Sequence, residues 1–148
     1  MRKRLARMGV TGVACLGAMA ATASPAQAAE PHHWMYTNDR SDKGGRVDFW
    51  PQGDKVRLCD TQSDGAHVDL VVVNVTKDPN QKEYGLEIGG AGCCQEVDSS
   101  NAGANLAEGD CFKFVIRLIK DGREVVPSED KAQWRNYNNS ERNCDGVT

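Results

Sequence analysis

Two adjacent histidines, His32 and His33, are the first residues whose chemistry suggests binding. A free amino terminus followed by histidine at position three can hold copper or nickel through imidazole and the intervening amide nitrogens. A chain cut after Ala29 would have Pro31 at position two, without an amide proton to lose, and a cut after Ala28 would place the first histidine fourth. We therefore expect a solvated arm, with a loose surface metal site at the two histidines as the alternative.

The segment from Asp60 to Gly65 has acids four residues apart and glycine at the sixth position, as a calcium loop would. The twelfth position of an EF-hand loop is a bidentate glutamate, whereas here it is Val71. We expect a β-turn in which Asp64 caps its own backbone. A calcium site of another type, using Asp60 and Asp64, is the alternative, and we predict no resident metal or cofactor.

Catalytic motifs are missing from the sequence. There is no G-x-S-x-G elbow, no H-E-x-x-H helix and no cysteine–histidine spacing that supports a nucleophile. A pair of carboxylates of the glycosidase type stays open, because a sequence does not give the separations between its 21 acids. The prediction is a protein that is not an enzyme.

Aromatic side chains that point outward could form a binding face, and the candidates are Trp50, Tyr84, Trp134 and Tyr137. Trp50 is out of phase with Val47 and Phe49, which favours the solvent side for its ring. For each of the four, packing in the core or against a turn is the main expectation.

Five cysteines follow the first 28 residues, and an oxidising compartment would convert them to disulfides rather than to metal ligands. Cys93 and Cys94 are adjacent, so we expect each to face a different partner. We predict a bridge between Cys94 and Cys111, then one between Cys59 and Cys93, with Cys144 unpaired. The odd thiol leaves a disulfide-linked dimer open.

Residues 1–28 have the three parts of a cleavable secretory signal peptide, which we expect to form a helix. Four cations and no acid occupy the first seven residues, an uncharged stretch of 16 residues follows, and Ala26-Gln27-Ala28 offers the small residues of a cleavage site. The uncharged stretch is shorter than the roughly 20 residues of a membrane span. Cleavage would leave 14 cations against 21 acids, a net charge of −7. We predict a secreted protein that binds neither membrane nor nucleic acid.

Short β-strands must position these side chains, because apolar residues recur with period two from Gly45 onward. A hairpin is predicted at 46–58, and the run at 68–73, apolar on both faces, predicts a central strand. Asp121-Gly122 is typical of a type I′ turn between 112–119 and 123–126. The other expected elements are a strand at 84–88, a disulfide-tethered loop at 89–109, a helical turn at 128–132 and a last strand at 133–137 with Trp134 inward.

About seven short strands and no long amphipathic helix predict an all-β fold, an antiparallel sandwich of the immunoglobulin-like kind. A small barrel is the alternative. The predicted organisation is a signal peptide at 1–28, a flexible arm at 29–44, the sandwich at 45–138 and a polar tail at 139–148.

Three segments carry a resemblance to known proteins: Phe49-Trp50-Pro51-Gln52-Gly53-Asp54, the run from Leu58-Cys59-Asp60-Thr61 into Ser63-Asp64-Gly65-Ala66, and Asn105-Leu106-Ala107-Glu108-Gly109-Asp110. They resemble the small secreted β-sandwich proteins of Streptomyces and related actinomycetes. The likeness extends over residues 45–137 and implies an immunoglobulin-like sandwich, without a known activity or site. In size, compartment and disulfides the chain is also similar to the secreted subtilisin-inhibitor family, although it lacks that family's Cys-Pro reactive loop.

Taken together, these features predict a secreted, non-enzymatic binding or structural module held by two disulfides, whose partner is an extracellular protein or polysaccharide. One alternative is a protease inhibitor that presents the 89–109 loop, because a braced loop enters a protease at low entropic cost. The other is a hydrolase of cell-wall or polysaccharide substrates.

Overall fold

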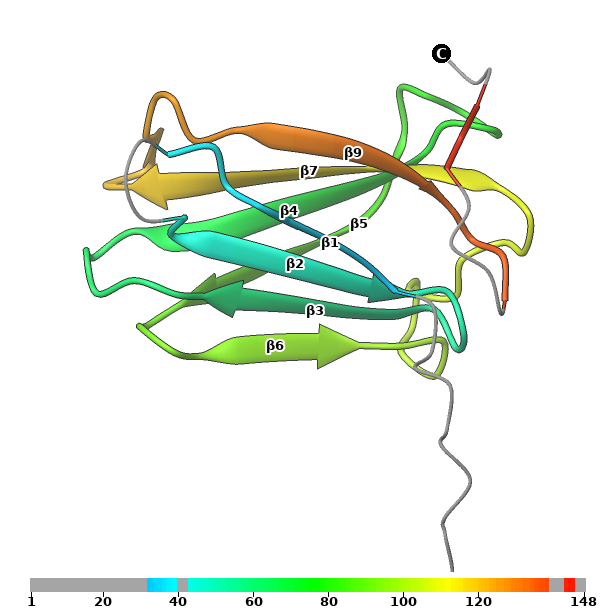
Figure 1. Cartoon of the computed structure of the whole chain (residues 1–148), viewed down its shortest axis with the longest axis horizontal. Helices are drawn as coiled ribbons and strands as arrows, with labels where there is room; N and C mark the ends of the chain where they lie inside the picture. Colours follow the sequence, from blue (N-terminus) through cyan, green and yellow to red (C-terminus); the bar gives the residue numbers. More distant parts are fainter. Residues whose placement is uncertain (1–31, 40–42, 139–142, 146–148) are drawn as a thin grey trace, which may run out of the picture.

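The structure is a computed structural model that describes residues 32–39, 43–138 and 143–145 (Figure 1). The predicted signal peptide, and parts of the predicted arm and tail, lie outside the described residues. Within them the chain forms β-strands and no helix. The described part is an antiparallel sandwich of two sheets, which confirms the predicted fold class.

Sheet A has four strands in the order β1 (His33–Tyr36), β2 (Gly45–Trp50), β3 (Lys55–Asp60) and β6 (Cys94–Val97). Sheet B is built around β4 (His67–Asn74), which lies between β5 (Lys82–Gly89) and β7 (Cys111–Lys120). β8 (Arg123–Glu124) and β9 (Asp130–Arg135) both pair with β7. The central place of β4 confirms what its two apolar faces predicted.

The core lies between the sheets and is made by the alternate, inward-pointing residues of their strands. Its fully buried members include Val47, Phe49, Val56 and Leu58 from sheet A and Val68, Leu70, Val72, Phe112, Phe114 and Ile116 from sheet B. Trp134 joins them, as predicted, with its ring centroid 4.8 Å from that of Phe114 and 6.3 Å from that of Phe49. Such aromatic contacts add about 0.5–1.5 kcal/mol each beyond the area they bury.

The predicted turns are confirmed where the backbone requires special dihedral angles. Asp121 and Gly122 have φ of 52° and 71°, as the type I′ turn between β7 and β8 demands. The hairpin of β2 and β3 has Val47 opposite Leu58 and Phe49 opposite Val56, so both strands present the same face to the core.

Three local predictions were wrong. The arm is not flexible throughout, because residues 33–36 form β1 and pair with β2. The loop at 89–109 contains β6, which pairs with β3. The helical turn predicted at 128–132 does not form, because residues 130–132 are the first half of β9. Their pairing with β7 outweighs a weak local preference for a helical turn.

The two disulfides join other cysteines than predicted: the structure has Cys59–Cys94 and Cys111–Cys144. Cys59 and Cys94 are direct partners across β3 and β6, which the prediction of a loop at 89–109 had hidden. A β-bridge between Trp134 and Asn143 brings the end of the chain back beside β9, next to β7. Among the described cysteines Cys93 is therefore the free, exposed one, and the predicted count of two bridges is confirmed.

Candidate binding face

The two histidines predicted to lie in a solvated arm have separate places in the sandwich. His33 is buried in β1, where its ring stacks 5.2 Å from that of Trp134 and 6.1 Å from that of Phe49. His32 contacts Asp48 through Nε2 at 3.2 Å on the opposite face of sheet A. Neighbouring residues of an extended chain point to opposite sides, so the pair is divided between core and surface.

The acids of the 60–65 segment hold turns. Asp60 accepts hydrogen bonds from the backbone amides of Gln62 and Gly90, at 3.0 and 2.8 Å. Asp64 accepts one from the amide of Ala66 at 2.8 Å, which confirms the predicted capping. A shallow, open pocket lies over residues 61–64. Among the described residues, no three histidine, cysteine, aspartate or glutamate side chains are grouped so that they could hold a metal ion.

The four aromatic residues named from the sequence do not form one surface. Trp134 is in the core, Tyr84 packs partly buried against it, and Tyr137 is 45% exposed beyond the end of β9. Of the four, Trp50 lies on the outward side of sheet A, which its phase favoured although packing in the core or against a turn was the main expectation. The sequence interpretation had missed its aromatic neighbours there, Trp34 and Tyr36, although His33-Trp34-Met35-Tyr36 has period two.

The outer face of sheet A is formed by the residues that alternate with the core residues of β1, β2 and β3. They are Trp34 and Tyr36 on β1, Arg46, Asp48 and Trp50 on β2, and Lys55 and Arg57 on β3. The antiparallel register sets Trp34 opposite Asp48 and Asp48 opposite Arg57. Tyr36 lies opposite Arg46, and Trp50 opposite Lys55. Tertiary pairing thus brings side chains from three strands into one cluster.

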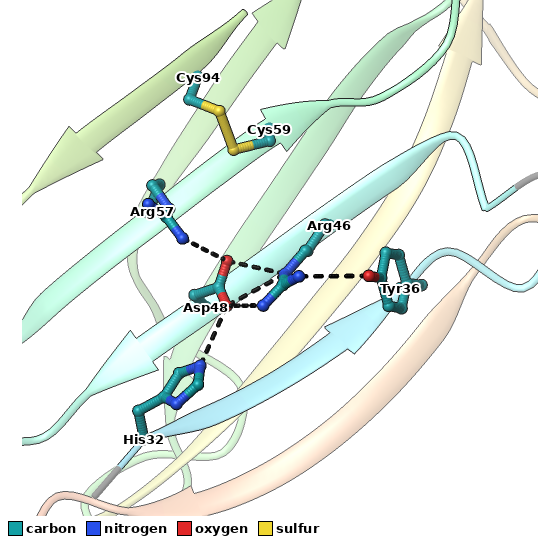
Figure 2. A network of polar contacts seen from close by, with 7 residues as sticks. All are labelled: His32, Tyr36, Arg46, Asp48, Arg57, Cys59 and Cys94. Carbon is teal, nitrogen blue, oxygen red and sulfur yellow. Dashed lines mark hydrogen bonds and ion pairs between the residues drawn. A yellow bond between two sulfur atoms is a disulfide. The ribbon is translucent and has the colours of Figure 1, made fainter. Parts of the chain in front are cut away.

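Asp48 is the centre of this cluster and is completely buried (Figure 2). Arg46 donates to both of its oxygens through Nε, at 3.0 and 3.1 Å, and also through Nη2. Arg57 approaches from β3 at 3.4 Å. Arg46 donates in turn to the Tyr36 hydroxyl at 3.2 Å. The hydrogen bond to Asp48 raises the pKa of the Arg46 guanidinium above its ordinary value, against a smaller opposing effect of burial.

Cations lie over the aromatic rings of this face. The Lys55 ammonium is 4.5 Å and the Arg57 guanidinium 5.1 Å from the Trp50 ring centroid. The His32 ring is stacked parallel to that of Trp50, with 5.0 Å between their centroids. The contacts of Lys55 and Arg57 combine charge with an apolar support, and each is worth about 0.5–1 kcal/mol at an exposed position.

The same arrangement recurs at the other end of the face. Lys43 lies 4.7 Å from the centroid of Tyr36, and Arg46 lies 5.5 Å from Tyr36 and 5.7 Å from Trp34. Trp34 is nevertheless 54% exposed, which is unusual for so large an apolar side chain. Tryptophan and arginine together are the residues that most often carry binding energy at interfaces.

The Cys59–Cys94 disulfide lies next to the cluster, and Figure 2 shows it bridging the two strands at the edge of sheet A. β6 is a short edge strand without a buried residue, so the disulfide adds to a weak attachment. The covalent link holds β6 against β3, beside Arg57. The outer face is therefore built on a rigid part of the fold rather than on loops.

Charged pairs on sheet B are isolated by comparison. Arg117 contacts Asp69 at 2.7 Å, and His67 contacts Glu87 at 3.1 Å. Both pairs are partly exposed, and such surface pairs contribute little to stability. They lack the stacked rings and the buried carboxylate that distinguish the outer face of sheet A.

The chain matches no protein-family model, and no curated protein shows significant similarity to it. In the part of the chain that the structure describes, no helix has the length and apolar character needed to cross a membrane.

Proposed function

We propose that the protein is a secreted, non-enzymatic binding module and that it contacts its partner through the outer face of sheet A. The observation that carries the proposal is the exposed Trp34 ring beside a set of cations whose positions are fixed by rings and by buried Asp48. Side chains ordered in advance lose less conformational entropy on binding, so their contacts yield more affinity. A sandwich with two disulfides supplies a stable support for such a face.

The state of the buried acids supports a binding rather than a catalytic role. Asp54 accepts hydrogen bonds from the Asn136 amide and from the backbone amide of Leu106, at 2.8 and 2.9 Å. Asp48 and Asp60 have the several partners described above. Carboxylates that accept several hydrogen bonds from the protein in this way stabilise the fold.

The 89–109 segment offers less support to the inhibitor hypothesis than the sequence had suggested. β6 takes four of its residues into sheet A, and Ala104 and Leu106 are buried. A loop that serves as bait for a protease must be extended and accessible. We therefore retain the binding module as the proposed function.

Sedimentation with the insoluble envelope and extracellular polymer of the producing organism tests this proposal. We expect the secreted protein to sediment with this material and Trp34→Ala to lose at least tenfold in affinity, because the removed ring is a principal contact. Tyr137→Ala, which removes an exposed ring outside the outer face, is the matched control and should bind like the unaltered protein. Equal binding by both variants and the unaltered protein would refute the assignment of the face.

A further inference from the structure

We propose that the partner of the outer face is an acidic polysaccharide, a polymer in which sugar rings carry carboxylates. This inference depends on the proposed function, since it names the ligand class of the same face. Three properties of the face support it: its positive charge, the exposed ring of Trp34 and its extent across three strands.

The charge of the face is opposite to that of the chain as a whole. Four of the 14 cations that follow residue 28 are gathered at its rings: Lys43, Arg46, Lys55 and Arg57. The carboxylate among them, Asp48, lies buried beneath the guanidinium groups. Glu96 faces Arg57 from β6, so an acid limits the positive area at this edge of sheet A. Hydrogen bonds from Ser100 lower the pKa of Asp98, with a smaller contribution from the charge of Lys55. An anionic partner is therefore complementary to this face.

The cations have donors left for a ligand. A guanidinium group has five N–H donors. Among the described residues, Arg57 donates only to Asp48, at 3.4 Å, and its side chain is 40% exposed. Its terminal nitrogens can therefore donate to the carboxylate of a ligand, while the contact of Nη2 with Asp48 restrains the guanidinium group. Paired N–H donors of guanidinium match the two oxygens of a carboxylate better than a single ammonium does.

The rings select sugar in addition to charge. The Trp50 ring is contacted by His32, Lys55 and Arg57, whereas Trp34 has only Arg46 over its ring, 5.7 Å from the centroid, among the cation contacts of the described residues. Trp34 is still 54% exposed and offers an apolar surface. A sugar ring with a carboxylate presents both an apolar C–H side and an anionic group. One such unit can lie against Trp34 while its carboxylate, or that of the next unit, reaches Arg57.

The shape of the face suits an extended polymer. Trp34, Asp48, Arg57 and Glu96 form one row across the four strands of sheet A. Adjacent strands are about 4.8 Å apart, so the row from β1 to β3 spans roughly 10 Å. A ligand that contacts both Trp34 and Arg57 must therefore extend along the surface of the sheet.

A nucleic acid would also combine stacking with negative charge, but it carries a phosphate on every unit. Binding it requires an extended basic surface. Here the positive area consists of four cations on one face of a chain in which acids outnumber cations by 21 to 18. Sparsely placed carboxylates fit that area better.

Binding isotherms with four soluble polymers separate the contributions of sugar and charge. They are polygalacturonate, a neutral glucan, poly-glutamate and a single-stranded oligonucleotide, each titrated at low and at high salt. We expect polygalacturonate to bind at least tenfold more tightly than the other three and to weaken as salt is raised. Lys55→Gln and Arg57→Gln should each reduce that affinity severalfold. Arg117→Gln, which removes the matching cation of sheet B, should leave it unchanged.

The outcomes distinguish this inference from the proposed function. Equal binding of poly-glutamate or of the oligonucleotide would overturn it, because charge alone would then be recognised. Equal binding of the neutral glucan would overturn it as well, while leaving the face as a sugar-binding surface. If no polymer binds but sedimentation with the native material still depends on Trp34, the ligand class is wrong and the proposed function stands. Circular dichroism of every variant checks that it is folded.

Discussion

Replacing Asp48 with asparagine should destabilise the protein more than any comparable change at a surface carboxylate. Asp48 is 0% exposed and neutralises Arg46 and Arg57, which asparagine cannot do. Removing one partner of a buried ion pair costs about 3–5 kcal/mol, because the remaining charge is left buried. The side chains of Arg46 and Arg57 are 32% and 40% exposed and can regain water, so we reduce the expected loss to about 2–3 kcal/mol.

Urea unfolding of the oxidised protein measures this loss. With a slope of about 1.5 kcal/mol per molar urea, the midpoint should fall by roughly 1–2 M. Asp69→Asn is the matched control, because Asp69 also pairs with an arginine across neighbouring strands, but its side chain is 23% exposed. We expect it to cost about 0.5–1 kcal/mol. If Asp48→Asn is no more destabilising than Asp69→Asn, Asp48 does not organise the outer face.

Three further predictions concern other parts of the fold. Burial, with a contribution from the charge of Asp54, raises the pKa of the Tyr84 phenol above its ordinary value of 10. The contribution of the protonated phenol to stability is therefore complete below pH 10 and is lost as the pH rises above it. By pH 11 the free energy of unfolding of the unaltered protein should fall by about 1.4 kcal/mol more than that of Tyr84→Phe. Urea unfolding in a Cys93→Ser background measures both proteins. Parallel pH profiles would contradict the burial of the phenol. Cys93 should be the single cysteine of the secreted protein that maleimide labels without reduction, and intact mass should therefore show one adduct. Oxidation should produce a disulfide-linked dimer that Cys93→Ser abolishes. Two adducts, or none, would mean that the disulfides join other cysteines. Asn136→Ala should lower the free energy of unfolding by about 2–3 kcal/mol, measured by thermal unfolding. The side-chain amide of Asn136 donates to Asp54 and to the Leu106 carbonyl, at 2.8 and 3.0 Å. A loss below about 0.5 kcal/mol would show that water takes over these hydrogen bonds.

The alternation of apolar and polar residues predicted most of the sandwich. A sequence of a few residues is enough to indicate that a strand forms and which of its faces is buried. The hairpin of β2 and β3, the central β4 and the turn at Asp121-Gly122 all carried such local signals. The outward phase of Trp50 and the inward position of Trp134 followed from the same rule. β1 was missed because a buried histidine, His33, occupies one of its two inward positions.

The outer face and the disulfides depended on pairing between distant segments, which alternation does not specify. Asp48 meets Arg57 and His32 only because β2 pairs with β1 on one side and with β3 on the other. Cys94 meets Cys59 for a similar reason, since the register of β6 sets them opposite each other. The sequence by itself determined that the chain is all-β and which residues face outward in its main strands. The tertiary structure decided which of those residues become neighbours, because strand register is set by the packing of the whole core.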